Sequence, residues 1–257
     1  QEVTAAVVSN MTRGRSCSCL MAVKVEIDVF PIDMGIACEV EHRGELHPLT
    51  ERKIRRGTSN FTKAAAMTRQ EVLTAILTGI DAVRVLKEQG YRLSAVGEMG
   101  IGNTTTSSAV ASVLLQKDPE LVTGAGAGLD SAGLKRKTEA IRRGIGLHHP
   151  DPMDGMEVLQ KVGGFDLAAM AGAFLGGAIY HVPVVIDGVI AAAAAAAAGR
   201  IAPAATDYML AAHVSAEPAS IWLLDLIGVT PAIQAGLRLG EGTGALALFP
   251  LLDMALS

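Results

Sequence analysis

The sequence predicts an α/β fold with a parallel sheet, because of its composition and its recurring order of strand, turn and helix. Half of the 257 residues are hydrophobic, only 4% are aromatic and 28 are glycine, which indicates backbones packed closely around small side chains. Strands that alternate with helices are typical of a parallel sheet. A chain of this length can bury a substantial core.

Charge and hydropathy argue against several classes of function. The net charge is -4, the isoelectric point is near 5.9 and no long basic block occurs, so neither a nucleic-acid surface nor a membrane surface is indicated. The most apolar stretch, 163–199, is interrupted by polar residues and is a poor membrane span. Cys17, Cys19 and Cys38 fit neither a disulfide framework nor a zinc site, so we expect a reducing cytoplasm.

The first half of the chain begins the pattern of elements. Residues 22–36 alternate apolar and polar side chains, as a strand with a turn near Pro31 would, and 39–60 are expected to form a solvated surface loop. Thr68 and Glu71 form a capping box that starts a helix ending at Gly90. A short strand over 91–96, a glycine-rich turn and a helix over about 104–116 follow.

The same order recurs in the second half. The apolar run "VPVVID" (182–187) predicts a buried strand, and a turn at Gly188 leads into a helix over 189–198, with the alanine tract 191–198 buried. "DYMLAAHVS" (207–215) precedes a helix expected to open at Glu217 and Pro218. Between the two halves, 128–143 predict an amphipathic helix capped by Ser131.

Three strand ends bear polar residues and are expected to form one cleft, because ligands of parallel sheets bind outside the carboxyl ends of the strands. They are Glu98 to Thr106, Asp187 with Gly188, and Ser215 with Glu217.

The turn "GIGNTTT" (100–106) suits an anion such as a phosphate or carboxylate. Gly100 and Gly102 let the backbone approach, while Asn103, Thr104 and Thr105 can donate hydrogen bonds. The alternative is a tight turn with a threonine helix cap. Glu98 beside an anion site suggests that the ligand also has sugar hydroxyls.

Two further segments contain candidate residues. The helix 128–143 is rich in lysine and arginine, and one lysine is expected to reach the phosphate, although periodicity does not choose which. Glu241 lies between two glycines, after Arg238 and before an apolar helical run. It is either a first-turn residue that complements the helix dipole, or a general base that needs burial or a partner to tune its pKa.

These segments together resemble one family, the nicotinate mononucleotide:dimethylbenzimidazole phosphoribosyltransferases of cobalamin lower-ligand assembly. The resemblance rests on "RKIRRGTSNF", "GEMGIGNTTTSSA", "GLDSAGLKRK", "GGFDLAAMAGA", "PVVIDGVI", "HVSAEP" and "RLGEGTGA", in order along almost the whole chain. It implies a doubly wound, mostly parallel, Rossmann-like three-layer α/β domain over 22–235. A small helical domain would form from 1–21 and 236–257. The protein would be a cytoplasmic homodimer that needs no metal or other cofactor.

The resemblance also implies roles for individual residues. Glu241 matches the catalytic base that takes the proton from the incoming azole. Residues matching substrate-binding positions are Glu98, Met99, Gly100, Gly102, Asn103, Thr104, Lys137, Asp187, Gly188, Ser215, Arg238 and Leu239. Of these, Glu98 would face the ribose, Lys137 the phosphate, and Met99 and Leu239 the base pocket.

The chain departs from the family in two places, and these leave alternatives open. Ala125 and Ala127 stand where members commonly have arginine and threonine, and Gln1 aligns roughly eighty residues into a typical member, so we expect either a fragment or a chain whose first part was not observed. The alternatives are a paralogue that uses adenine or a phenol, as one subunit of a heterodimer, and a ribotide-binding protein without turnover.

Overall fold

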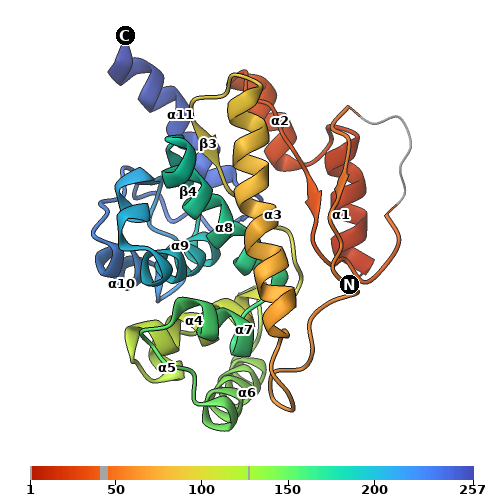
Figure 1. Ribbon diagram of the computed structural model, residues 1–257, viewed down its shortest axis with the longest axis vertical. Helices are drawn as coiled ribbons and strands as arrows, with labels where there is room; N and C mark the ends of the chain where they lie inside the picture. Colours follow the sequence, from red (N-terminus) through yellow and green to blue (C-terminus); the bar gives the residue numbers. More distant parts are fainter. Residues whose placement is uncertain (1, 41–45, 127) are drawn as a thin grey trace.

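The computed structural model describes residues 2–40, 46–126 and 128–257 (Figure 1). The helices are α1 Glu2–Thr12, α2 Cys17–Lys24, α3 Arg69–Glu88, α4 Asn103–Leu115, α5 Pro119–Val122, α6 Ser131–His148, α7 Gly155–Val162, α8 Phe165–Tyr180, α9 Val189–Ile201, α10 Ser220–Ile227 and α11 Thr243–Leu256, with a 3-10 helix at Pro203–Tyr208. The strands are β1 Ile32–Asp33, β2 Thr50–Glu51, β3 Ser94–Ala95, β4 Val184–Ile186 and β5 Met209–Ala211.

The sheet that positions the site is parallel, as predicted. Its order is β3-β4-β5, with Ser94 opposite Val184 and Val184 opposite Met209. β1 and β2 form a second parallel pair. The α/β fold with parallel strands is therefore confirmed, although the strands are only two or three residues long and helices make up most of the structure.

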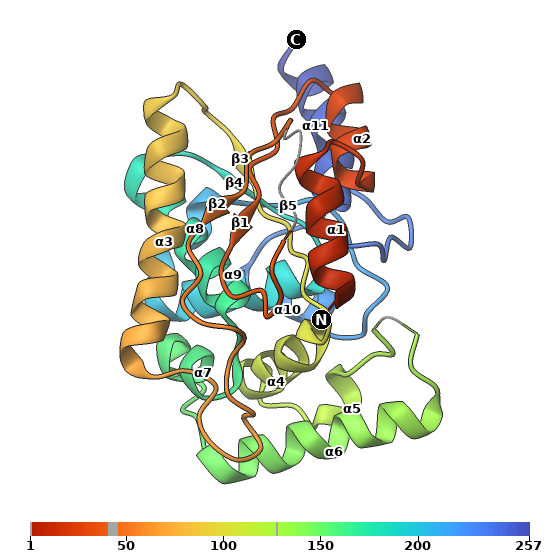
Figure 2. The ribbon, with the colours of Figure 1, turned by 90° about the vertical axis from the view of Figure 1, so that its right-hand side faces the viewer.

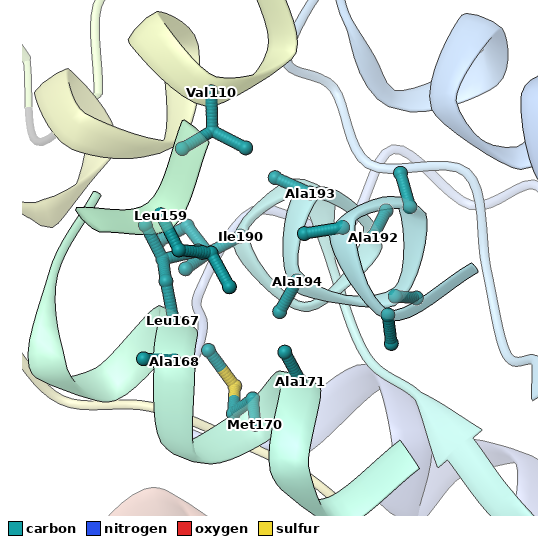
Figure 3. Close-up of a cluster of buried hydrophobic side chains, with 14 of the residues drawn as sticks. Val110, Leu159, Leu167, Ala168, Met170, Ala171, Ile190, Ala192, Ala193 and Ala194 are labelled. Carbon is teal, nitrogen blue, oxygen red and sulfur yellow. The ribbon is translucent and has the colours of Figure 1, made fainter. Parts of the chain in front are cut away.

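Small residues let the helices of the core lie unusually close together. All eight alanines of 191–198 are buried in α9, as predicted, among side chains of α4, α7 and α8 (Figure 3). A Cβ on Gly79 of α3 would lie 1.9 Å from the carbonyl oxygen of Ala169, and one on Gly172 of α8 would lie 2.0 Å from that of Ile76. The glycine-rich composition thus reflects backbone-to-backbone packing.

Several predicted elements are confirmed within a few residues. The capping box at the start of α3 has both hydrogen bonds, Glu71 N to Thr68 Oγ1 at 3.2 Å and Thr68 N to Glu71 Oε2 at 2.7 Å. α4 begins one residue before the expected start, and α9 follows Gly188 as expected.

The strand predicted over 22–36 is wrong. Ser16 caps a helix there, since its side chain accepts a hydrogen bond from Cys19 N, and this helix, α2, continues to Lys24. Glu26 has a positive φ of 54°, and only Ile32–Asp33 joins a strand ladder. Residues 25–26 form a turn and 27–31 belong to neither a helix nor a strand, so irregular chain gave the alternating pattern there.

The starts of two helices differ from the predicted ones, and part of the predicted surface loop is not simply solvated. Asp130, not Ser131, caps α6, because its Oδ1 accepts a hydrogen bond from Gly133 N at 2.6 Å. α10 begins at Ser220 rather than Glu217, since the Ser220 hydroxyl accepts a hydrogen bond from Ser215 N and holds a turn before the helix. Arg55 is not simply solvated: it donates to Glu71 Oε1 at 2.5 Å and to Ala66 O at 3.0 Å.

The N-terminal and C-terminal segments of the described chain meet where α2 packs against α11 (Figure 2). The expected boundary at residue 22 falls inside α2. The division into a domain over 22–235 and a small helical domain from the ends stays a proposal. Within the described ranges, no helix is both long and apolar enough to cross a membrane.

Candidate active site

The two acidic turns singled out in the sequence are in direct contact. A Cβ on Gly97 would lie 2.5 Å from the backbone nitrogen of Gly242, and one on Gly240 would lie 3.1 Å from Glu98 Oε1. Glu98 follows β3, and Glu241 precedes α11. Chain segments more than 140 residues apart thus place both carboxylates on adjoining turns at the carboxyl edge of the sheet.

Glu98 is part of a chain of polar groups. Its Oε2 accepts a hydrogen bond from Asn103 Nδ2, and the same amide nitrogen donates to Asp166 Oδ2 at 2.8 Å. Burial raises the pKa of Glu98 to about 7, and the charges of Asp166 and Asp187 act in the same direction. The Asn103 bond and the Gly100 N–H oppose this increase. Glu98 therefore exchanges a proton near neutral pH.

Glu241 occupies a strained turn. Its φ is 59°, between Gly240 at 85° and Gly242 at 78°, and a left-handed conformation costs a residue with a side chain about 1 kcal/mol. Its Oε2 accepts a long hydrogen bond of 3.4 Å from Ser18 Oγ of α2. Because α11 begins at Thr243 with no acidic residue in its first turn, the alternative that Glu241 lies in that turn is wrong.

The carboxylate that interacts with the first turn of α11 is that of Asp187. It follows β4, is 4% exposed, and its Oδ1 accepts a hydrogen bond from Ala245 N in the first turn of α11 at 2.9 Å. His213 Nε2, also buried, lies 3.8 Å from the same oxygen. Burial raises the pKa of Asp187, although the N–H groups of α11 and His213 favour its ionised form.

Lys137 lies at the other end of the site, against the start of α4. It is 6% exposed, and its Nζ donates to Thr104 Oγ1 and to Gly124 O, both at 3.0 Å. Burial lowers the pKa of Lys137, and Glu217 opposes this decrease. Glu217 Oε1 in turn accepts a hydrogen bond from Gly126 N at 3.1 Å. The structure thus selects one lysine of α6, the one that the resemblance indicated.

The glycine-rich turn leaves the start of α4 without a side-chain cap. Gly102, at φ 101°, is the N-cap residue and has no side chain to cap the helix, so the threonine-cap alternative is wrong. The N–H groups of Asn103 and Thr105 donate to the carbonyl oxygens of Gly100 and Gly102, both at 3.0 Å, so it is mainly the helix dipole that favours an anion at this position. A Cβ on Gly100 would meet Asn103 Nδ2 at 3.2 Å.

Of the other predicted residues, some are buried or partly buried and others are exposed. Ser215 is buried, and a Cβ on Gly188 would lie 4.0 Å from the Cβ of Ser215, so the second and third strand ends meet. Met99 is partly buried against α1 and the segment near Val40. Arg238 and Leu239 are both exposed beside the Glu241 turn. Ala125 precedes the turn that Glu217 holds, and Ala127 lies outside the described residues.

Sequence reasoning left three residues of this region out of the candidate set. They are Ser18, Asp166 and His213. Asp166 and His213 stand in the quoted segments "GGFDLAAMAGA" and "HVSAEP", so those segments were the available signal. Among the residues that the structure describes, no group of three or more histidine, cysteine, aspartate or glutamate side chains is arranged to hold a metal ion.

Comparison with known proteins identifies the family. A family model described as "Phosphoribosyltransferase" matches residues 1–257. The chain is 43% identical, over 99% of its length and 71% of the relative, to a Clostridium acetobutylicum protein named "Nicotinate-nucleotide--dimethylbenzimidazole phosphoribosyltransferase". The chain belongs to this phosphoribosyltransferase family.

Other members of the phosphoribosyltransferase family agree with this assignment. A protein of the same name from Ruminiclostridium cellulolyticum is 44% identical over 100% of the chain and 72% of the relative. A crystal structure of CobT from Thermus thermophilus matches with a TM-score of 0.93 and 39% identity, over 99% of this chain and 75% of that one. The family resemblance and the α/β fold predicted from the sequence are confirmed.

Proposed function

We propose that this phosphoribosyltransferase family member transfers the 5-phosphoribosyl group of nicotinate mononucleotide to a ring nitrogen of dimethylbenzimidazole. The products are α-ribazole phosphate and nicotinate. The observation that supports this most directly is the contact between the Glu98 and Glu241 turns, at the edge of a parallel sheet where ligands bind. If both carboxylates serve one active site, this explains why glycine-to-glycine packing brings their turns together.

Glu241 acts as the general base. One nitrogen of the azole forms a bond to C1′ of the ribose while Glu241 accepts the proton from the other nitrogen, so positive charge does not accumulate on the acceptor. The bond from C1′ to nicotinate breaks, and its electron pair neutralises the pyridinium nitrogen. Nicotinate therefore leaves without an acid, and attack from the opposite face converts the β-glycoside to the α form.

Glu98 faces the sugar. Near neutral pH its carboxyl is partly protonated in the free protein. The pyridinium of the bound ribotide, and the positive charge that develops on the ribose, favour the ionised form. Asn103 holds the carboxylate by a hydrogen bond and anchors it to Asp166 at the start of α8.

The phosphate binds between Lys137 and the start of α4. Lys137 Nζ already contacts Thr104 Oγ1, and the N-terminus of this 13-residue helix supplies a favourable dipole. Gly126 lies beside Lys137, since a Cβ on it would be 3.3 Å from Lys137 Nζ, and its N–H donates to Glu217 Oε1. Gly188 and Ser215 line the ribotide end, and Met99, Arg238 and Leu239 line the acceptor side.

The reaction requires no cofactor, since proton transfer and charge stabilisation come from side chains. A cytoplasmic homodimer is the assembly that the family resemblance favours, with nicotinate mononucleotide and an aromatic base as its small-molecule partners. A heterodimer with a paralogue is the alternative assembly.

An assay of nicotinate release tests the proposal. The 257-residue chain is incubated with nicotinate mononucleotide and either dimethylbenzimidazole, adenine, a phenol or no acceptor, and the products are separated chromatographically. We expect release that depends on dimethylbenzimidazole. Release with only adenine or a phenol would assign a different acceptor, and ribotide binding without release would identify a binding protein.

A further inference from the structure

Asp187 has more contacts with the polypeptide than a ligand-binding residue needs. α11 is preceded by Gly242, which has no side chain to cap the helix, and its first N–H groups need acceptors. Asp187 supplies one from 58 residues away, through the 2.9 Å bond from Ala245 N. The N–H groups of Gly244 and Gly242 also stabilise its charge. The end of β4 thereby holds the start of α11.

His213 packs against the same turn. Asp187 and His213 are 4% and 5% exposed, and a Cβ on Gly244 would lie 2.2 Å from His213 Nε2 and 2.8 Å from Asp187 Oδ1. The first turn of α11 therefore rests directly on the two side chains. Among the described residues, His213 Nδ1 is buried without a hydrogen-bond partner, so packing holds this side of the ring.

The turn held in this way contains Glu241. Glu241 has a positive φ between two glycines, and a residue with a side chain keeps such a conformation only where its surroundings hold it. Gly97 packs against one side of this turn, and Asp187 anchors its exit into α11. The hydrogen bond of the Glu241 side chain with Ser18 is 3.4 Å long, too long to orient a carboxylate by itself.

We propose that Asp187, backed by His213, is a positioning residue for the transfer reaction: it fixes the first turn of α11 and so aims the Glu241 carboxylate at the acceptor. The inference rests on the proposed function, in which Glu241 is the base. A general base must lie within hydrogen-bonding reach of its proton, and a misplacement of about 1 Å can lower the rate about 100-fold. Asp187 acts through Glu241 and does not touch the reacting atoms.

A double-mutant cycle tests the proposal, with kcat measured by nicotinate release and Kd for nicotinate mononucleotide measured by calorimetry. We expect Asp187→Ala to lower kcat about 100-fold with little change in Kd. Asp187→Asn, whose amide oxygen can still accept the Ala245 N–H, should recover about tenfold of that loss. In the Glu241→Gln background, Asp187→Ala should cause little further loss, because its effect passes through the base.

The control is Asp154→Ala, which removes the carboxylate that caps α7 and accepts a hydrogen bond from Glu157 N, and should leave kcat unchanged. If Asp187→Ala does not fold, Asp187→Asn and its Glu241→Gln double variant complete the same cycle. Losses that multiply in the double variant, or a higher Kd with normal kcat, would overturn the positioning role. Normal turnover by Glu241→Gln alone would instead overturn the base assignment.

Discussion

Gly97 and Gly242 are in backbone contact, and this contact joins the two acidic turns of the site. A Cβ on Gly97 would meet Gly242 N at 2.5 Å and Gly242 Cα at 2.7 Å. Both partners are backbone atoms, so neither can rotate away as a side chain could. The close approach therefore fixes the separation of the Glu98 and Glu241 turns.

Gly97→Ala should separate these turns. We expect kcat to fall by more than about tenfold and the free energy of unfolding to fall by about 1–3 kcal/mol, since overpacking displaces backbone. Turnover and urea denaturation measure the two effects. Gly146→Ala in α6, where an added Cβ meets nothing within 4 Å, is the control, and equal behaviour of the two variants would contradict the prediction.

Glu241→Gln should remove most turnover and leave nicotinate mononucleotide bound. The amide cannot accept the azole proton, and loss of a general base typically costs about 100- to 10,000-fold. Steady-state kinetics and calorimetry with the ribotide separate the two properties. A near-normal rate would show that another group accepts the proton.

Lys137→Ala should mainly weaken ribotide binding. A hydrogen bond to a charged group contributes about 1.5–3 kcal/mol, so we expect Kd to rise about 10- to 100-fold. Lys135→Ala is the matched control, because Lys135 lies on the same helix and is exposed. Unchanged affinity in a folded Lys137→Ala variant would refute the phosphate role.

The pKa of Glu98, raised from 4.5 to about 7, makes stability depend on pH. Between these two values the folded protein binds more protons than the unfolded chain, so its stability falls as pH rises and levels off above the folded pKa. The full shift corresponds to a loss of at most about 3 kcal/mol. Urea denaturation across this range should show a slope that Glu98→Gln reduces, and an unchanged slope would contradict the shift.

Gly172→Ala should destabilise the contact of α3 with α8. The added methyl group would lie 2.0 Å from the carbonyl oxygen of Ile76, so the helices must move apart. We expect the free energy of unfolding to fall by about 2 kcal/mol or more. Gly146→Ala should instead stabilise its open helix position by about 0.5–1 kcal/mol, and thermal unfolding of both variants would test this contrast.

Local signals predicted the elements that depend on neighbours in the chain. The capping box of α3, the buried alanine helix α9 and the strand–turn–helix order around β3 and β4 follow from hydrogen bonds and periodicity within a few residues. The prediction over 22–36 was wrong because the end of α2, a turn at Glu26 and irregular chain together show an alternation like that of a strand. Only Ile32–Asp33 pairs with a neighbouring strand.

The sequence by itself determined the parallel α/β class, the long helices, the family and the two acidic turns that hold its candidate chemistry. Tertiary structure alone decided which groups meet: Lys137 with Thr104, Asp166 with Asn103, and Asp187, rather than Glu241, with the first turn of α11. These pairings join segments tens of residues apart. Their energy comes from burial and from hydrogen bonds that exist only after the sheet and helices have packed, so no local pattern encodes them.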